Sequence, residues 1–225
     1  MGKKLILLLD DLNMPKVDTY GTQQPIALLK LVIERKGLFD RGKDLNWKNM
    51  RDILFSAAMG PPGGARNPVD PRFISLFSVF EIQFPALSSL MTIYDSMLSH
   101  HAVKLDKSIQ DAVHSVTEST LDLYNLIVEK LPPTPARFHY IFNLRDLSRV
   151  YEGLMQATPD VFESLAKFIR LWRHEALRIF HDRLISEEDR SIFHDGIAEM
   201  IGKRFGGCME VALAEPILYG DFLKS

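Results

Sequence analysis

The sequence has a single cysteine, Cys208, and no long uninterrupted apolar run. One thiol excludes an intrachain disulfide framework and fits a reducing compartment such as the cytoplasm. The apolar run near the start extends only from Leu5 to Leu9, far short of the roughly 20 residues that cross a bilayer. Acids follow it where a signal peptide would have small residues. We therefore expect neither a membrane span nor a targeting signal.

An excess of charge of one sign is also missing. The formal net charge is −2 and the isoelectric point is about 6.4. Nucleic acids and anionic membranes attract proteins with a clear basic excess, so we expect no nucleic-acid partner and no membrane partner. Hydrophobic residues make up 46% of the 225 residues, which is enough for a substantial core.

The chain lacks a convincing phosphate-binding loop. Only GLFDRGKD, residues 37 to 44, resembles GxxxxGK[ST], and it has Asp44 where Ser or Thr should contact Mg²⁺. Such a loop also needs a strand before it and a helix N-terminus after it, whereas here a helical pattern precedes and a polar segment follows. We interpret it as a solvated turn.

Metal-binding and nucleophilic motifs are equally weak. In HEALRIFH the histidines His174 and His181 are seven residues apart, whereas HExxH needs four to bring both rings to one zinc ion. We expect both to be packed or surface helix residues. Nothing in the sequence pairs with Cys208, which we expect to be buried without a chemical role.

The pattern that is present predicts an α/β fold whose second half is all helical. Apolar runs at 3–9, 52–59 and 77–84 predict strands, the first covered on both faces, and 23–36 predicts an amphipathic helix with a hairpin or loop after it. Helix-linked apolar strands indicate a parallel sheet. Helical periods cover 87–100, 106–130, 143–157, 160–185 and 187–205, the third with Asn143 as N-cap. We expect a parallel-sheet subdomain over 1–85 and a helical subdomain over 86–225.

Two adjacent acids, Asp10 and Asp11, follow the first predicted strand. Ligands of open α/β sheets gather at the carboxyl ends of the strands, where a carboxylate can hold Mg²⁺ beside nucleotide phosphates. Asp10 would then hold the metal and Asp11 would orient an attacking water. A strand that merely ends in a polar turn is the alternative.

Three arginines could complement a phosphate. Arg66 and Arg72 lie in the proline-rich GPPGGARNPVDPRF after the second strand, and Arg145 opens the helix in FNLRDLSR. A guanidinium held on a short rigid segment matches phosphate geometry better than a flexible lysine does. A surface ion pair is the alternative for each arginine.

Taken together, the motifs resemble the third AAA+ module of a dynein heavy chain. The similarity covers essentially the whole chain, and the GPPGGARNP wording is closer to the axonemal kind than to the cytoplasmic kind. It rests on five blocks in order: DDLNMPKVDTYGTQQPIALLKLVIE, AAMGPPGGARNPVDPRF, HYIFNLRDLSRVYEG, RLWRHEALRIFHDRL and PILYGDF.

The resemblance implies roles for individual residues. LILLLDD resembles the Walker B strand, with Asp10 as the Mg²⁺-side acid and Asp11 where many AAA+ proteins have the catalytic glutamate. Arg72 matches the arginine finger presented to the nucleotide of the neighbouring module, and Arg145 resembles the sensor II arginine. Gly60 stands at the sensor I position, usually Asn. The helical half resembles the lid.

The resemblance also implies ATP or ADP with Mg²⁺ in the intact module. The chain starts at Walker B, so we expect a fragment of a motor polypeptide that holds no cofactor and does not hydrolyse ATP alone. Asp11 is shorter than Glu and Gly60 has no side chain, which favours a regulatory role. The implied partners are neighbouring AAA+ modules and, through other regions, intermediate chains, light chains and microtubules.

The family implies a place in the cytoplasm and cytoskeleton, in the axoneme of a cilium or flagellum. Two alternatives remain open. The segment could be a nucleotide-free structural ring spacer or protein-interaction module whose acids and arginines form ion pairs. It could also belong to an unrelated AAA+ remodelling ATPase.

Overall fold

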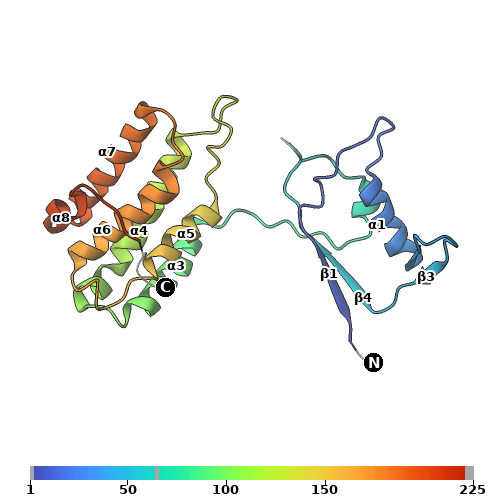
Figure 1. The fold of residues 1–225 in the computed structure, drawn as a ribbon, viewed down its shortest axis with the longest axis horizontal. Helices are drawn as coiled ribbons and strands as arrows, with labels where there is room; N and C mark the ends of the chain where they lie inside the picture. The colour runs from blue at the N-terminus through green and yellow to red at the C-terminus, as the bar shows by residue number, and fades with distance from the viewer. Residues whose placement is uncertain (1–2, 64–65, 221–225) are drawn as a thin grey trace. The chain divides into compact units, whose positions relative to one another are not determined.

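The chain divides into two compact units (Figure 1), one ending at Gln83 and the other beginning at Phe84. The computed structural model describes residues 3–63 and 66–220. Each unit has its own hydrophobic core. Gly64 and Ala65 of the GPPGGARNP block, and Asp221 and Phe222 of the PILYGDF block, lie outside the described residues.

A short parallel sheet and one main helix form the first unit. Its elements in chain order are β1 (Leu5–Leu9), α1 (Gln24–Arg35), β2 (Gly37–Phe39), β3 (Trp47–Asn49), β4 (Ile53–Ala57) and α2 (Pro71–Ile74). β1 and β4 pair in parallel, with Leu9 opposite Ala57, so their carboxyl ends meet at one edge. The predicted strands at 3–9 and 52–59 and their parallel pairing are confirmed, and β2 and β3 form the expected hairpin.

The junction between α1 and β2 explains the glycine at its centre. Pro25 lies in the first turn of α1, where its missing N–H has no intrahelical partner to lose. The helix ends at Lys36, which adopts a left-handed conformation with φ of 52°. A Cβ on Gly37 would lie 2.6 Å from the carbonyl oxygen of Lys48, so only glycine lets the hairpin close against the helix end.

Two expectations for this unit are wrong. β1 is not covered on both faces: Ile6 is 65% exposed, and Leu5 and Leu8 are exposed too. Residues 77–84 form no strand, and Ile82 in the middle of the segment is 91% exposed. A strand needs a neighbour for its backbone hydrogen bonds, and β1 and β4 pair only with each other among the described residues. Residues 77–84 therefore have the apolar pattern of a strand but no neighbouring strand among the described residues.

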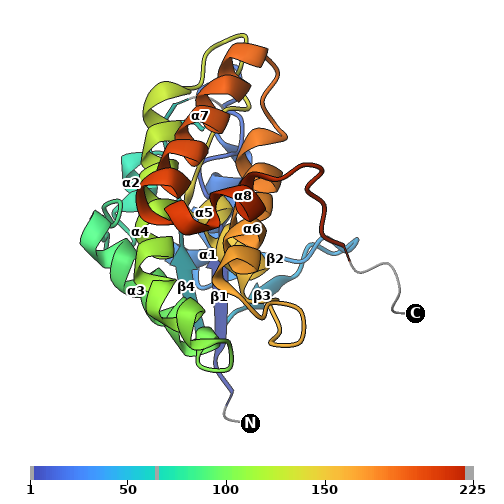
Figure 2. The same ribbon diagram turned by 90° about the vertical axis from the view of Figure 1, so that its left-hand side faces the viewer.

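Helices build the whole of the second unit. They are α3 (Leu87–Ala102), α4 (Lys107–Lys130), α5 (Leu144–Leu154), α6 (Leu165–Ala176), the π-helical turn η1 (Leu177–His181), α7 (Glu187–Arg204), the 3₁₀ turn η2 (Gly206–Cys208) and α8 (Met209–Leu213). α4 packs against α3, α6 and α7 (Figure 1). α8 lies beside α6 (Figure 2).

Large aromatic side chains fill the core of this unit. Trp172 on α6 is fully buried, and its indole N–H donates to Thr120 Oγ1 on α4 at 2.8 Å. Tyr94 on α3 stacks on Tyr151 of α5 with ring centroids 4.4 Å apart. The first contact joins α4 to α6 and satisfies the buried indole N–H, and the second joins α3 to α5.

The helix predicted over 160–185 differs from the structure. It begins only at Leu165, after an extended Ser164 at the N-cap, and its last turn is π-helical from Leu177. Phe162 is buried in the core just before the helix, and an α-helical path through Ser164 would point that ring elsewhere. The other four helices of this unit are confirmed, with ends shifted by a few residues.

No helix of the described part of the chain combines the length and the apolar character needed to span a membrane.

Candidate functional site

The two acids lie in a tight turn directly after β1. Asp10 is exposed at the carboxyl end of the strand, and its Oδ1 accepts a hydrogen bond from the Asp11 main-chain N–H at 2.9 Å. Asp11 is in the left-handed region with φ of 47°, a conformation that Asp tolerates better than most residues. The two carboxylates are therefore turned apart at the mouth of the sheet.

Asn13 ties this turn to the end of β4. Its side chain is only 1% exposed, and its Nδ2 donates to the carbonyl oxygen of Gly60 at 2.7 Å. The Asn13 carbonyl oxygen accepts from the N–H of Asn67 at 2.9 Å. No role in the site was predicted for Asn13 from the sequence. Its signal was an amide close behind the acids, a residue type that commonly bonds to nearby backbone.

Arg66 reaches the same place from the segment after β4. Its Nη2 lies 3.1 Å from Asp11 Oδ1, forming an ion pair with both side chains about half exposed. A Cβ on Gly60 would lie 3.1 Å from Arg66 Nε. The guanidinium therefore occupies the space into which a side chain at position 60 would extend.

A small hollow of about 290 Å³ adjoins the acids. It is open to solvent, and apolar side chains form most of its wall. Its lining residues are Leu8, Leu9, Asp10, Asp11, Leu12, Pro15, Pro25, Ile26 and Leu29. Asp10 forms no ion pair with any described residue, so its carboxylate is free for a water-bridged cation. An exposed carboxylate is a ligand type that Mg²⁺ accepts, but none of the residues that line the hollow carries a positive charge for a phosphate.

Arg72 lies in the first turn of α2. The Asp70 side chain caps this turn by accepting from the Arg72 N–H at 3.0 Å, and the next residue, Phe73, is fully buried in the core of the unit. The backbone is thus anchored on both sides. The Arg72 side chain itself is exposed and pairs with no acid among the described residues, so it is available to an external anion.

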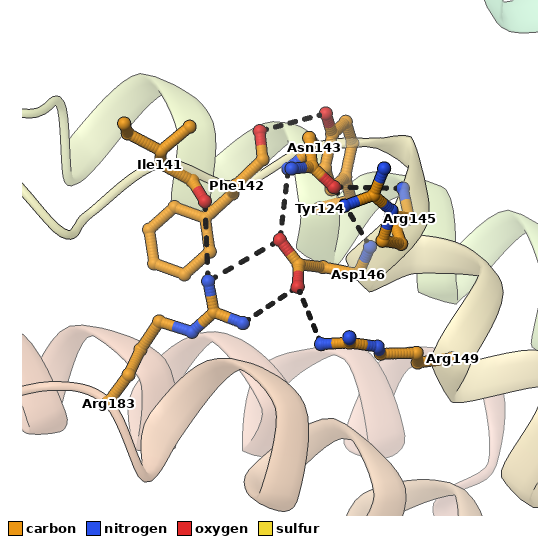
Figure 3. Close-up of polar contacts among 8 residues, drawn as sticks. All are labelled: Tyr124, Ile141, Phe142, Asn143, Arg145, Asp146, Arg149 and Arg183. Carbon is orange, nitrogen blue, oxygen red and sulfur yellow. Dashed lines mark hydrogen bonds and ion pairs between the residues drawn. The ribbon is translucent and has the colours of Figure 1, made fainter. Parts of the chain in front are cut away.

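Arg145 lies in the second unit, at a strongly capped helix start (Figure 3). The Asn143 side chain accepts from the N–H groups of Arg145 and Asp146 at 2.9 and 3.2 Å. The Asp146 carboxylate accepts from the Asn143 N–H at 3.2 Å, completing a capping box. The Arg145 side chain is exposed. Asn143 is confirmed as the N-cap of α5.

The capping acid is also the centre of an ion cluster. Asp146 is buried, and Arg183 donates to its Oδ1 at 2.8 Å while the exposed Arg149 lies 3.7 Å away. Arg183 also lies over the Phe142 ring, 5.1 Å from its centroid. Figure 3 shows Arg145 and Arg183 on opposite sides of Asp146. These contacts therefore fix the start of α5 and leave the Arg145 side chain exposed to solvent.

The predicted site residues thus fall into two groups. Asp10, Asp11, Gly60 and Arg66 come together at the carboxyl ends of β1 and β4. Arg72 lies farther along the first unit, and Arg145 belongs to the second. The sequence did not single out Asp146 or Arg183 as a pair, because the two are separated by 37 positions.

The weak motifs of the sequence can be placed in the structure. Asp40 to Asp44 form an exposed turn between β2 and β3, not a phosphate loop. Over residues 3–63 and 66–220, no three His, Cys, Asp or Glu side chains gather closely enough to hold a metal ion. Cys208 is a buried free thiol, and burial raises its pKa, which makes it less reactive.

Comparison with known families gives two matches along this chain. The family described as "P-loop containing dynein motor region" matches residues 1–85, and "Dynein heavy chain, ATPase lid domain" matches residues 93–190. The first therefore covers the unit with the acids, and the second covers the helix start that carries Arg145.

Curated relatives are axonemal dynein heavy chains. The flagellar inner arm I1 complex dynein-1-alpha heavy chain of Chlamydomonas reinhardtii is 61% identical over 224 residues, and human dynein axonemal heavy chain 10 is 54% identical over 222 residues. Human dynein axonemal heavy chain 6 is 41% identical over 225 residues. Each alignment covers 99% of this chain and 5% of the relative.

The two family matches cover both structural units, and the relatives align along nearly the whole chain. The chain therefore belongs to the axonemal dynein heavy chains, of which it represents part of the AAA+ motor region with its helical lid.

Proposed function

We propose that this chain forms part of the third AAA+ module of an axonemal dynein heavy chain, and that this module acts as a nucleotide-dependent regulator of the motor. The observation that carries the proposal is the exposed pair Asp10 and Asp11 at the carboxyl end of a parallel strand, beside a hollow. This is where open α/β sheets bind ligands.

Each site residue has a role in this proposal. Asp10 holds Mg²⁺ through water, and Asp11 stands where a carboxylate would orient the attacking water. Arg145, exposed on a fixed helix start, contacts the nucleotide of the same module. Arg72, exposed on the anchored α2 turn, contacts the nucleotide of the neighbouring module, which is the partner this side chain requires.

Residues 3–63 and 66–220 contain no phosphate loop. Without those backbone N–H groups and a phosphate-binding lysine, most of the charge stabilisation needed for phosphoryl transfer is missing. The chain by itself is therefore not expected to bind ATP tightly or to hydrolyse it.

The names of the relatives support a proposed location, and the proposed partners go with the motor role. They are named as axonemal heavy chains, one of them in a flagellar inner arm complex, so the proposed location is the axoneme of a cilium or flagellum. Neighbouring AAA+ modules contact this segment. Intermediate chains, light chains and microtubules engage other regions of the heavy chain.

The test uses the complete motor region of the heavy chain. Asp10→Ala should lower the affinity of this module for a fluorescent ATP analogue at least tenfold in Mg²⁺, which corresponds to about 1.4 kcal/mol. Arg145→Ala should also weaken binding, and both changes should slow microtubule gliding. The matched control is Asp44→Ala, which removes an exposed acid from the β2–β3 turn. Normal gliding by a motor with both site substitutions would contradict the mechanism.

One observation favours a second candidate function. Asp11 is already paired with Arg66, which suits a structural ring spacer that carries no nucleotide. A density map of the intact ring separates the two proposals. ADP or ATP with Mg²⁺ beside Asp10 supports the regulatory site, and an empty cleft there supports the spacer.

A further inference from the structure

Arg66 is held in place more firmly than an ordinary surface arginine. Gly63 and Arg66 exchange two main-chain hydrogen bonds, each of 3.1 Å. The next residue, Asn67, is bonded to the acid turn through its N–H to the Asn13 carbonyl and through its Nδ2 to the Pro15 carbonyl at 3.1 Å. Main-chain hydrogen bonds therefore hold Arg66 itself and Asn67 after it, and the Arg66 guanidinium reaches Asp11.

The glycine at position 60 makes this approach feasible. A Cβ there would lie 3.1 Å from Nε, 3.3 Å from Cδ and 3.4 Å from Cζ of Arg66. These contacts are tighter than ordinary van der Waals contacts, so a Cβ at position 60 would require the Arg66 side chain to shift by a few tenths of an ångström. Gly60 is itself fixed, because its carbonyl accepts from Asn13. The missing side chain at position 60 and the Arg66 to Asp11 ion pair thus belong to one arrangement.

The ion pair with Arg66 limits the hydrogen bonds that the Asp11 carboxylate can accept from other groups. Arg66 Nη2 lies 3.1 Å from Asp11 Oδ1, so one carboxylate oxygen already accepts from the guanidinium and is less open to a water molecule. The side chains are 44% and 52% exposed. An exposed pair of this kind is weak, worth up to about 1 kcal/mol, so it restrains Asp11 without locking it.

We propose that Arg66 is a positioning residue that restrains Asp11 and so slows hydrolysis of nucleotide at this module, with Gly60 providing the space that the restraint needs. This inference rests on the proposed nucleotide site. A module restrained in this way retains its nucleotide for longer, which is the property that a regulator needs and a fast motor site does not.

The experiment uses the complete motor region with the phosphate-binding lysines of the other modules replaced, so that only this site turns over. Arg66→Ala should raise phosphate release about fivefold, the equivalent of about 1 kcal/mol, with the dissociation constant of a fluorescent ATP analogue changed less than twofold. Arg66→Lys should keep turnover near that of the unmodified protein. Arg51→Ala, a change at an exposed arginine before β4, should alter neither quantity.

A second substitution tests the role of Gly60 independently. Gly60→Ala should raise turnover in the same direction but by a smaller factor than Arg66→Ala, because the added Cβ would shift the flexible Arg66 side chain by only a few tenths of an ångström. In a protein that already carries Arg66→Ala, the Gly60 change should add nothing, since its target is gone.

The outcomes distinguish a failure of the Arg66 restraint from a failure of the proposed nucleotide site. If nucleotide binds and Arg66→Ala leaves turnover unchanged or lowers it, the restraint is disproved and the nucleotide site stands. If no nucleotide binds at this module in the unmodified protein, the proposed function fails and the restraint fails with it.

Discussion

Asp146 shows how one buried carboxylate can serve two purposes. It completes the capping box at the start of α5 and accepts the ion pair from Arg183. A buried carboxylate is costly unless it is both hydrogen-bonded and paired. Arg183 also donates to the Ile141 carbonyl at 3.3 Å, so a single side chain fixes the segment that leads into the Arg145 helix.

Removal of the Arg183 side chain should destabilise the folded chain substantially. Arg183→Ala leaves the buried Asp146 with the Asn143 N–H and, as its nearest cation, the exposed Arg149 at 3.7 Å, so the free energy of unfolding should fall by about 3 kcal/mol. Urea unfolding followed by circular dichroism measures the change. Arg149→Ala is the matched control, because that side chain is 51% exposed and should cost less than about 1 kcal/mol. Equal losses for both variants would contradict the assignment.

At the same scale, residue types predicted part of the candidate site. Asp10, Asp11 and Arg145 could be singled out because a pair of acids after an apolar run, or an arginine after an N-cap, is a local pattern. The partner of Asp11 could not be predicted, because Arg66 is 55 positions away and three arginines were equal candidates. Asn13 was underestimated, since its bond to Gly60 spans 47 positions.

At the scale of elements, the segment between α4 and α5 is clamped to the start of α7. Arg137 donates to Asp189 Oδ1 at 2.7 Å, and the hydroxyl of Tyr140 donates to Oδ2 at 2.9 Å. Burial alone would raise the pKa of Asp189, but the hydrogen bonds from Ser186 and Tyr140 and the charge of Arg137 outweigh it and lower the pKa below its usual value of 3.8.

The contacts of Asp189 with Arg137 and Tyr140, here called the clamp, should make the free energy of unfolding depend on pH. A carboxylate whose folded pKa is lowered stabilises the fold above its unfolded pKa and loses that contribution as pH falls through the folded value. Asp189→Asn should therefore cost about 2 kcal/mol at pH 7, and the difference from the unmodified chain should shrink below pH 3.8. Unfolding curves at pH 7, 4 and 3 measure it.

The control for this prediction lies on the same helix. Asp195 is exposed on α7 and forms no ion pair within the described part of the chain, so Asp195→Asn should change stability little at any of these pH values. A cost for Asp189→Asn that stayed constant down to pH 3 would show that packing, not charge, fixes the clamp.

The elements themselves were predicted to different degrees. Helices with a clear cap and period, such as α4 after Asp106 and α5 after Asn143, follow from local sequence because the cap is a local hydrogen bond. The prediction of a strand over 77–84 is wrong. A strand needs a neighbouring strand for its backbone hydrogen bonds, and an apolar pattern alone does not provide one. The start of α6 was misplaced because Phe162 enters the core and the chain is extended at Ser164.

At the scale of the whole molecule, β1 and β4 expose apolar side chains and open edges. The sheet of the first unit contains only these two strands within the described residues, and Ile6 is 65% exposed. Open, apolar edges pair readily with other chains. The 225-residue chain should therefore self-associate at micromolar concentration.

A charge on the edge strand should oppose this association. Ile6→Lys should shift the chain towards monomer in sizing chromatography with light scattering, because a lysine on an edge strand disfavours pairing. Leu28→Lys, at an exposed position on α1, is the control and should leave association unchanged. A sharp monomer peak for the unmodified chain would refute the expectation.

The sequence by itself determined the α/β first unit and helical second unit, the strand that ends in Asp10 and Asp11, and the capped helix that carries Arg145. These depend on local periodicity, caps and turns, which act between residues a few positions apart. Only the tertiary structure decided that Arg66 forms an ion pair with Asp11 beside Gly60, that Arg183 forms an ion pair with Asp146, and that the side chains of β1 are exposed. Such contacts depend on where the chain returns in space, and no local pattern encodes that path.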